Sequence, residues 1–117
     1  QRLRDRSRAA LATPEKSTGR RLYDAIVAGG AAAAGRETGA IRPGLLADLV
    51  ALDADHIDLD GRQGDTLLDS FIFAGDDRMV QDVWSAVRHM VRGGRHVARD
   101  SIAAAYRATL RDLRDAL

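Results

Sequence analysis

The spacing of apolar residues predicts a first long helix over residues 18–34. Leu22 and Ile26 fall on one face at helical spacing, followed by a smooth surface of glycines and four successive alanines. Thr18 is the expected N-cap, and Gly35 is the expected left-handed residue that ends the helix. Helical glycine costs about 1 kcal/mol relative to alanine, so we expect this helix to pack closely against a neighbour.

A second amphipathic helix is predicted at the end of the chain, with Asp100 as its N-cap. Its apolar stripe repeats every three or four residues and consists of Ile102, Tyr106, Leu110, Leu113 and Leu117. At the other end, the arginine-rich segment Gln1–Ala12 favours a short helix by composition. A basic arm for nucleic acid would interleave aromatic residues to stack on bases, and this segment has none.

The period changes between the two long helices, where short strands are predicted. Leu49–Leu52 follows a Pro-Gly turn as a buried strand, and Met79–Val91 is predicted to form an antiparallel hairpin. Residues 54–64 are a predicted loop, and a helix from Asp65 to Phe73 follows it. About four short strands are too few to close a sandwich or barrel, so their edges require partners.

Composition limits the class of protein further. The 117 residues suit one domain, and the net charge of +1 indicates neither nucleic acid nor an acidic membrane as a partner. The apolar stretch Ile26–Ala34 is far shorter than the ~20 residues that span a bilayer. The chain has no cysteine, which agrees with a cytoplasmic location. Because it begins at Gln1 rather than Met, we expect a further segment upstream.

The histidines and acidic residues offer few candidates for chemistry. His89 and His96 lie seven residues apart with no third ligand suggested, so surface or interface packing is the expected role. His56 lies among Asp53, Asp55, Asp58 and Asp60, which lack the spacing and central glycine of a calcium loop. The serines have no nucleophile-elbow context. Trp84 is expected in the core.

Several segments resemble enzymes of the amidohydrolase superfamily. Residues 39–53, with their Pro-Gly turn and Ala-Asp-Leu-Val run, are similar to the superfamily's C-terminal signature, and residues 83–91 resemble the hairpin that follows it. Within the superfamily, the resemblance is to the formimidoylglutamate deiminase family, and three segments carry it: residues 18–25, 64–75 and 94–100. Leu45 departs from the usual Lys or Arg. Val87 replaces the usual hairpin glycine, so the turn and its register are expected to differ.

The resemblance implies an α+β fragment: terminal helices of a (β/α)8 barrel, part of a small β-sandwich and a C-terminal helix. The implied divisions are residues 1–38 for the last helical part of the barrel, 39–98 for the composite sandwich and 99–117 for the helix. The implied partners are the remainder of the parent chain, with its barrel and N-terminal sandwich strands, and further copies in a homo-oligomer. No nucleic acid and no membrane are expected as partners.

The resemblance also implies the reaction. Enzymes of this family bind one divalent metal, usually zinc, which makes hydroxide available near neutral pH. Hydroxide attacks the formimino carbon of N-formimino-L-glutamate, ammonia leaves, and N-formyl-L-glutamate remains. In the family, the metal ligands and catalytic groups precede the segment that matches this chain. We therefore assign this chain no catalytic, metal-binding or substrate-binding residue and expect the isolated chain to be inactive.

Two alternatives remain open. One is another deaminase or chlorohydrolase of the same superfamily, acting for example on guanine or a triazine. The other is a standalone, non-catalytic module that dimerises through its strand edges and the helix that contains Leu110–Leu117. In the fragment hypothesis, the small-residue face Ala31–Ala34 and the strand edges near Leu49 and Val83 are expected to be exposed.

Overall fold

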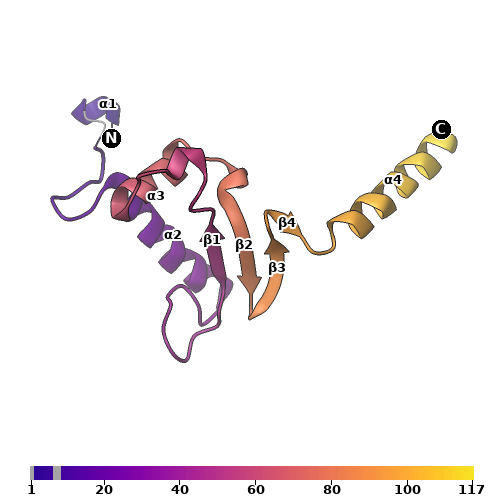
Figure 1. The fold of residues 1–117 in the computed structure, drawn as a ribbon, viewed down its shortest axis with the longest axis horizontal. Helices are drawn as coiled ribbons and strands as arrows, with labels where there is room; N and C mark the ends of the chain where they lie inside the picture. The colour runs from indigo at the N-terminus through magenta and orange to yellow at the C-terminus, as the bar shows by residue number, and fades with distance from the viewer. Residues whose placement is uncertain (1, 7–8) are drawn as a thin grey trace.

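The computed structural model describes residues 2–6 and 9–117 and has mixed helices and strands with one small antiparallel sheet (Figure 1). This confirms the α+β class. In chain order the elements are α1 (Arg2–Asp5), α2 (Thr18–Ala34), β1 (Leu49–Leu52), the 3-10 turn η1 (Ile57–Leu59), α3 (Gly64–Phe73), the 3-10 turn η2 (Asp77–Met79), β2 (Val80–Ser85), β3 (Arg88–Arg92), β4 (Arg95–His96) and α4 (Arg99–Asp115).

The sheet has the order β1-β2-β3-β4, and every neighbouring pair is antiparallel. Val83 pairs with Val50 on one side and Val91 on the other, so it lies in a central strand. The expectation of a free edge near Val83 is therefore wrong. The register shifts between Ala51 and Leu52 in β1, and again between Val83 and Trp84 in β2. Such irregularities increase the local twist of a sheet.

The two hairpins of the sheet turn with different residues. Gly93 and Gly94 join β3 to β4 with φ of 53° and 72°, values that glycine adopts without steric cost. Ala86 and Val87 join β2 to β3 with φ of 47° and 62°. Val87 thus takes the left-handed conformation that β-branched residues resist. The hairpin still forms with a two-residue turn. The expected change of register lies in β2 between Trp84 and Val83, beyond the first two residue pairs after the turn.

Helix α2 has the predicted extent, but its N-cap is one residue earlier than expected. Ser17, not Thr18, has the extended backbone of a cap, and its side-chain oxygen accepts from the Arg20 amide. Gly35 ends the helix at φ 61°, as predicted. Ala32, Ala33 and Ala34 are exposed and Ala31 is half-buried, so the small-residue face is largely uncovered, as the fragment hypothesis expects.

The other helices also begin earlier than their predicted caps. Gln63 precedes α3 and exchanges capping hydrogen bonds with Thr66, so Asp65 lies inside the first turn. Ala98 precedes α4, and Asp100 lies in its first turn. Helix α1 covers only four residues of the short helix predicted over residues 1–12, of which 1, 7 and 8 lie outside the described part. Leu117 follows the end of α4.

The core is very small. Leu59 and Met79 are the buried apolar side chains among the described residues. Met79 lies under the end of α3, where its sulfur would be 2.6 Å from a Cβ added at Gly75. Trp84 is only half-buried, so its expected place in the core is wrong. Its ring stacks instead on His89, with ring centroids 4.4 Å apart.

The molecule is extended rather than compact. Its radius of gyration is 18.8 Å, whereas a compact domain of this length has about 13 Å. Its accessible surface is 9128 Å², compared with about 6,200 Å² for a compact monomer of this mass. Helix α4 extends away from the sheet (Figure 1). No described helix is long and apolar enough to cross a membrane.

Candidate functional site

The N-terminus of α2 is fastened to α3 by a polar cluster, the α2–α3 lock, formed by Ser17, Gly19, Arg20, Asp65 and Asp69. Asp69 Oδ1 accepts two hydrogen bonds, from Ser17 Oγ at 2.9 Å and from the Gly19 amide at 2.7 Å. The cap hydroxyl therefore serves two helices, because it also accepts from the Arg20 amide. A carboxylate at a helix N-terminus also interacts favourably with the helix dipole.

Asp65 is the second carboxylate of the α2–α3 lock. It accepts from the Ser17 amide at 2.8 Å and from Arg20 Nε at 2.8 Å. The amide hydrogen bond, followed by the Arg20 guanidinium, lowers the pKa of Asp65 below its ordinary value. The same contact raises the pKa of Arg20. Asp65 and Asp69 are four residues apart, which places both carboxylates on one face of α3.

Gly19 makes the close approach of the two helices possible. It is buried, and a Cβ at this position would lie 2.3 Å from Asp69 Oδ1 and 3.0 Å from its Cα. No side chain fits at that separation, so the α2–α3 lock requires glycine here.

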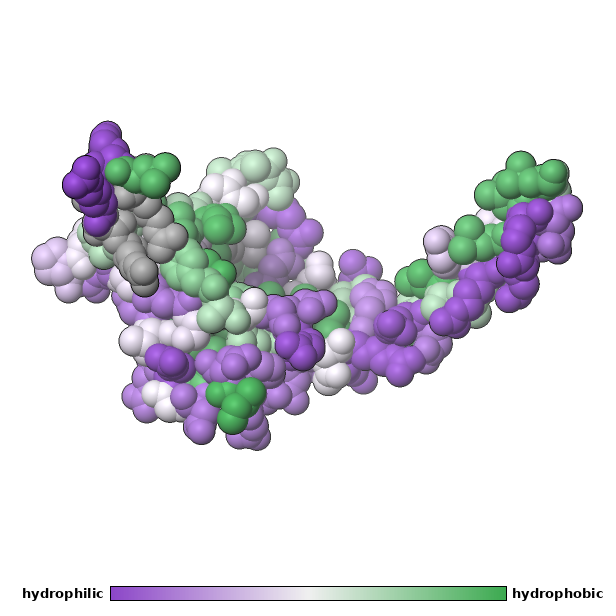
Figure 2. Space-filling model, turned by 90° about the horizontal axis from the view of Figure 1, so that it is seen from above, coloured by the Kyte–Doolittle hydropathy of each residue, from purple (hydrophilic) through white to green (hydrophobic). Residues whose placement is uncertain are grey.

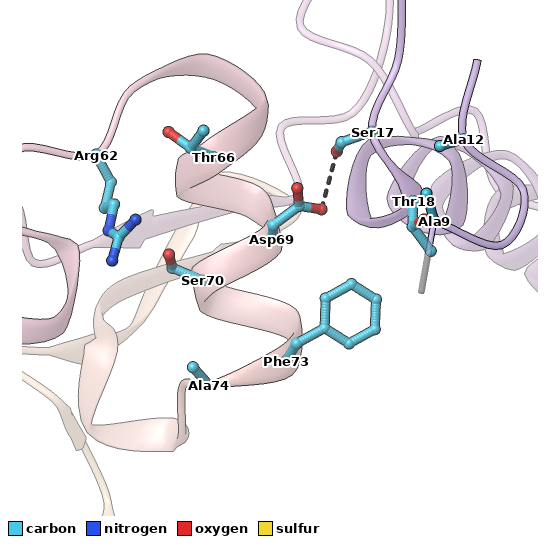
Figure 3. A pocket seen from close by; sticks show the side chains of 10 residues that line it. All are labelled: Ala9, Ala12, Ser17, Thr18, Arg62, Thr66, Asp69, Ser70, Phe73 and Ala74. Atoms are coloured by element: carbon cyan, nitrogen blue, oxygen red, sulfur yellow. Dashed lines mark hydrogen bonds between the residues drawn. The ribbon is translucent and has the colours of Figure 1, made fainter. Parts of the chain in front are cut away.

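An open hollow of about 560 Å³ lies beside the α2–α3 lock, between α3, the start of α2 and residues 9–12. Figure 3 shows the Asp69 carboxylate directed at Ser17, and the Phe73 ring directed toward Thr18 and Ala9. Both hydroxyls at the start of α2 donate structural hydrogen bonds: Ser17 Oγ to Asp69 Oδ1, and Thr18 Oγ1 to the Ala10 carbonyl. No histidine is among the described residues that line the hollow.

A second polar contact, the hairpin clasp, joins Arg36, Asp48 and the turn residue Ala86. Asp48 Oδ1 accepts from the Ala86 amide at 2.7 Å and from the Arg36 guanidinium at 2.9 Å. The hydrogen bond from the Ala86 amide, together with the charge of Arg36, lowers the pKa of Asp48. The adjacent Ala47 carbonyl accepts from the Val87 amide at 3.2 Å. The amides of both turn residues thus donate hydrogen bonds to residues 47–48, which holds Val87 in its left-handed conformation.

The histidines do not meet. His89 Nε2 lies 2.6 Å from Asp82 Oδ1, while His96 Nδ1 accepts from the Ala98 amide. His56 caps η1 through the Asp58 amide. The described residues contain no cluster of three or more side chains suited to a metal ion. The absence of catalytic, metal-binding and substrate-binding residues from this chain stays a prediction.

No role for Ser17, Gly19, Asp69 or Asp48 was predicted from the sequence. Two signals were available. The four-residue spacing of Asp65 and Asp69 predicts paired carboxylates on one helix face, and a glycine in the first turn of a helix indicates close packing. The resemblance also pointed to these positions, because Gly19, Asp65 and Asp69 lie in the segments that carry it, and Asp48 belongs to the Ala-Asp pair of the superfamily signature.

Comparisons with known proteins agree with this structure. No family model matches the chain. Over 116 residues, or 98% of its length, the chain is 45% identical to formimidoylglutamate deiminase of Pseudomonas aeruginosa, of which it covers 26%. The crystal structure of an amidohydrolase from Brucella melitensis matches 97% of the chain at 42% identity, with a TM-score of 0.77. The chain covers 25% of that structure.

The fold and these matches define the class that the chain resembles: it is similar over nearly its whole length to part of an amidohydrolase, and it spans about a quarter of the length of the relatives it matches. Within that superfamily, the predicted resemblance to formimidoylglutamate deiminase is confirmed. The match fits a C-terminal fragment of such an enzyme.

Proposed function

We propose that this chain is the C-terminal portion of a metal-dependent hydrolase that converts N-formimino-L-glutamate to N-formyl-L-glutamate and ammonia. The observation that carries the proposal is the 45% identity to formimidoylglutamate deiminase over 98% of the chain. The α2–α3 lock gives further support. Residues 18–25 and 64–75 carried the resemblance to this family, and the lock joins them through the hydrogen bonds from Gly19 to Asp69 and from Arg20 to Asp65.

In this proposal the chain supplies structure, and the rest of the parent protein supplies the chemistry. Residues 1–38 contribute the last helix of a (β/α)8 barrel, 39–98 part of a composite β-sandwich and 99–117 a C-terminal helix. One divalent metal, usually zinc in the family, is held outside this chain and provides activated water when bound. The exposed small-residue face of α2 and Val50, which is 55% exposed in β1, are surfaces that the barrel and the N-terminal strands would cover.

The test is ammonia release by the full-length cytoplasmic enzyme from N-formimino-L-glutamate, with N-formyl-L-glutamate identified as the product. We expect chelation to abolish the activity and zinc to restore it. Guanine and a chlorotriazine are the control substrates. Ammonia from guanine, or chloride from the triazine, with no turnover of N-formimino-L-glutamate would favour another enzyme of the superfamily. Turnover of none of the three substrates would contradict the proposal.

The standalone module is the second candidate, and the apolar stripe of α4 favours it. Its members are 45–63% exposed between Ile102 and Leu113, which suits self-association. The extended shape and the core of two buried apolar side chains among the described residues count against it as a complete protein. The intact mass of the native product separates the two, because a (β/α)8 barrel adds about 250 residues.

A further inference from the structure

Most exposed features of this chain depend on what the rest of the parent protein covers, and the apolar edge of α4 in Figure 2 is an example. The turn at Asp60–Gly61 is different, because it can react through its own atoms alone. It lies between η1 and α3 and contains the one Asp-Gly sequence of a chain that has no asparagine. In this sequence the side-chain carboxyl group and the following main-chain amide combine readily, since glycine has no Cβ to hinder their approach.

The geometry of this turn leaves its central peptide able to rotate. Asp60 has φ −57° and ψ 130° and Gly61 has φ 68°, which together define a type II turn. The Arg62 amide closes the turn on the Leu59 carbonyl at 2.9 Å. A type I turn keeps this hydrogen bond but has the central peptide rotated. Gly61 takes either sign of φ, and a Cβ there would meet nothing within 4 Å, so the rotation that brings its amide toward the Asp60 carboxyl group meets no obstacle among the described residues.

Both reacting groups lack competing contacts within the described part of the chain. The Asp60 carboxylate has no hydrogen bond or ion pair there, and the Gly61 amide has no acceptor. Asp58 in the same loop differs. The amide that follows it, that of Leu59, donates to the His56 carbonyl at 2.8 Å, and the Asp58 carboxylate lies 3.7 Å from His56 Nδ1. Of these two aspartates, Asp60 is therefore the one with both groups available.

We infer that Asp60–Gly61 is a site of spontaneous aspartate isomerisation in the full-length protein. The Gly61 nitrogen forms a bond to Asp60 Cγ, and the carboxyl hydroxyl leaves with the amide proton as water, which gives a five-membered succinimide. Water then adds to the main-chain carbonyl of Asp60 and breaks its bond to nitrogen, so the chain continues through Cγ as isoaspartate. Opening at the other carbonyl restores aspartate. The overall change is a rearrangement without change of mass, and it needs no oxidant or other reactant.

The place of the turn in the fold gives this rearrangement a structural consequence. Isoaspartate adds one methylene to the main chain. Before the turn, Leu59 is one of the two buried apolar side chains among the described residues, and after it, Gln63 caps α3. A longer connection between them displaces the start of α3, which carries Asp65 of the α2–α3 lock. Conversion is therefore expected to lower the melting temperature. The inference goes beyond the proposed function and does not depend on the substrate.

Peptide mapping of the full-length protein after prolonged incubation at neutral pH tests the site. Trypsin releases residues 37–62 as one peptide, because Arg42 precedes a proline. The isomer is expected as a second form of this peptide, equal in mass and increasing with time. A protease that cuts before aspartate is expected to leave residues 58–62 of the second form uncut, since it does not recognise isoaspartate. Asp60→Glu keeps the charge but would require a six-membered ring, so loss of the second form is expected.

A synthetic peptide of residues 54–64 is the control for the reactivity of the sequence, and we expect it to isomerise. Absence of the second form from the incubated protein overturns the inference, and isomerisation of the peptide would then show that the fold protects the turn. A second form that persists in Asp60→Glu also overturns it, because another aspartate would be the source. The melting temperature is expected to fall during incubation in the wild type and not in Asp60→Glu. An equal fall in both would contradict the structural consequence.

Discussion

Gly19 has the closest contact that a side chain would meet at any described glycine, because a Cβ would lie 2.3 Å from Asp69 Oδ1. We predict that Gly19→Ala lowers the free energy of unfolding of the full-length protein by about 1–3 kcal/mol through overpacking of the α2–α3 lock. Chemical denaturation measures the change. The control is Gly29→Ala in the same helix, where a Cβ has no neighbour within 4 Å.

Alanine favours helix over glycine by about 0.5–1 kcal/mol, and a Cβ at Gly29 meets no neighbour among the described residues. We therefore expect Gly29→Ala to destabilise the full-length protein less than Gly19→Ala does. A Gly19→Ala variant as stable as the wild type would show that α2 and α3 separate easily and that the α2–α3 lock does not constrain them.

The lowered pKa values of Asp65 and Asp48 predict an acid-sensitive fold. A carboxylate whose pKa is lower in the folded state stabilises the fold above its unfolded pKa of about 3.9 and loses that effect as the pH falls below it. We predict that Asp65→Asn and Asp48→Asn lower stability at pH 7 and reduce its decline between about pH 5 and pH 2. Thermal unfolding at each pH measures this, and Asp112→Asn on the exposed side of α4 is the control.

At the scale of single residues, the sequence predicted helix extents better than caps. Ser17 and Thr18 are both good capping residues, and propensity alone does not separate them. The contact of Ser17 with Asp69, 52 residues away, belongs to tertiary structure. Gln63 and Ala98 precede their helices although neither is a preferred cap, so the polar residue nearby was the wrong choice in both cases.

Among the elements, the β2–β3 hairpin has the least favourable turn. Val87 is 74% exposed and has φ of 62°, so its side chain contributes little packing while its backbone is strained. We predict that Val87→Gly raises the free energy of unfolding by about 0.5–1 kcal/mol, because relief of the left-handed strain exceeds the entropy cost of glycine. Denaturant unfolding of the full-length protein measures the gain.

Val97→Gly is the matched control for this prediction. Val97 is also largely exposed but does not have a positive φ. It is therefore expected to lower stability by about 0.5–1 kcal/mol through backbone entropy alone. If Val87→Gly destabilised the protein as much as Val97→Gly, the strain assigned to the turn would be absent.

At the scale of elements, the period of the apolar residues identified both long helices, the helix over residues 65–73, β1 and the hairpin. It did not identify the central place of β2, because strand order depends on pairing across the sheet. Nor did it reveal how a valine occupies the turn. That outcome depends on the hairpin clasp, in which Asp48 lies 38 residues before Ala86.

The whole molecule exposes about 2,900 Å² more surface than a compact chain of its mass. Each large apolar side chain left exposed forgoes about 1.5–3 kcal/mol of burial, and a typical domain has a net stability of only about 5–15 kcal/mol. We predict that residues 1–117 expressed alone are cut rapidly by trypsin and lack a sharp thermal transition. The same residues within the full-length protein resist cleavage. A protease-resistant monomer of the isolated chain would contradict this.

At this scale, the sequence predicted that the strands need partners, and the exposure of Val50 in β1 agrees with it. The position of α4 could not be predicted in the same way. An amphipathic stripe indicates that a helix face is covered, yet the covering surface is supplied by another part of the protein or by another copy, which this sequence does not contain.

The loop between α2 and β1 is closed by its own ends. The Leu46 amide bonds the Glu37 carbonyl at 2.8 Å, and Arg36 pairs with Asp48 just outside it. The residues between therefore form a closed loop, in which Ile41 is 90% exposed. Lengthening such a loop costs only about 0.6 kcal/mol per doubling. A fluorescent reporter inserted between Pro43 and Gly44 would leave the hairpin intact and would record when this surface meets the rest of the enzyme.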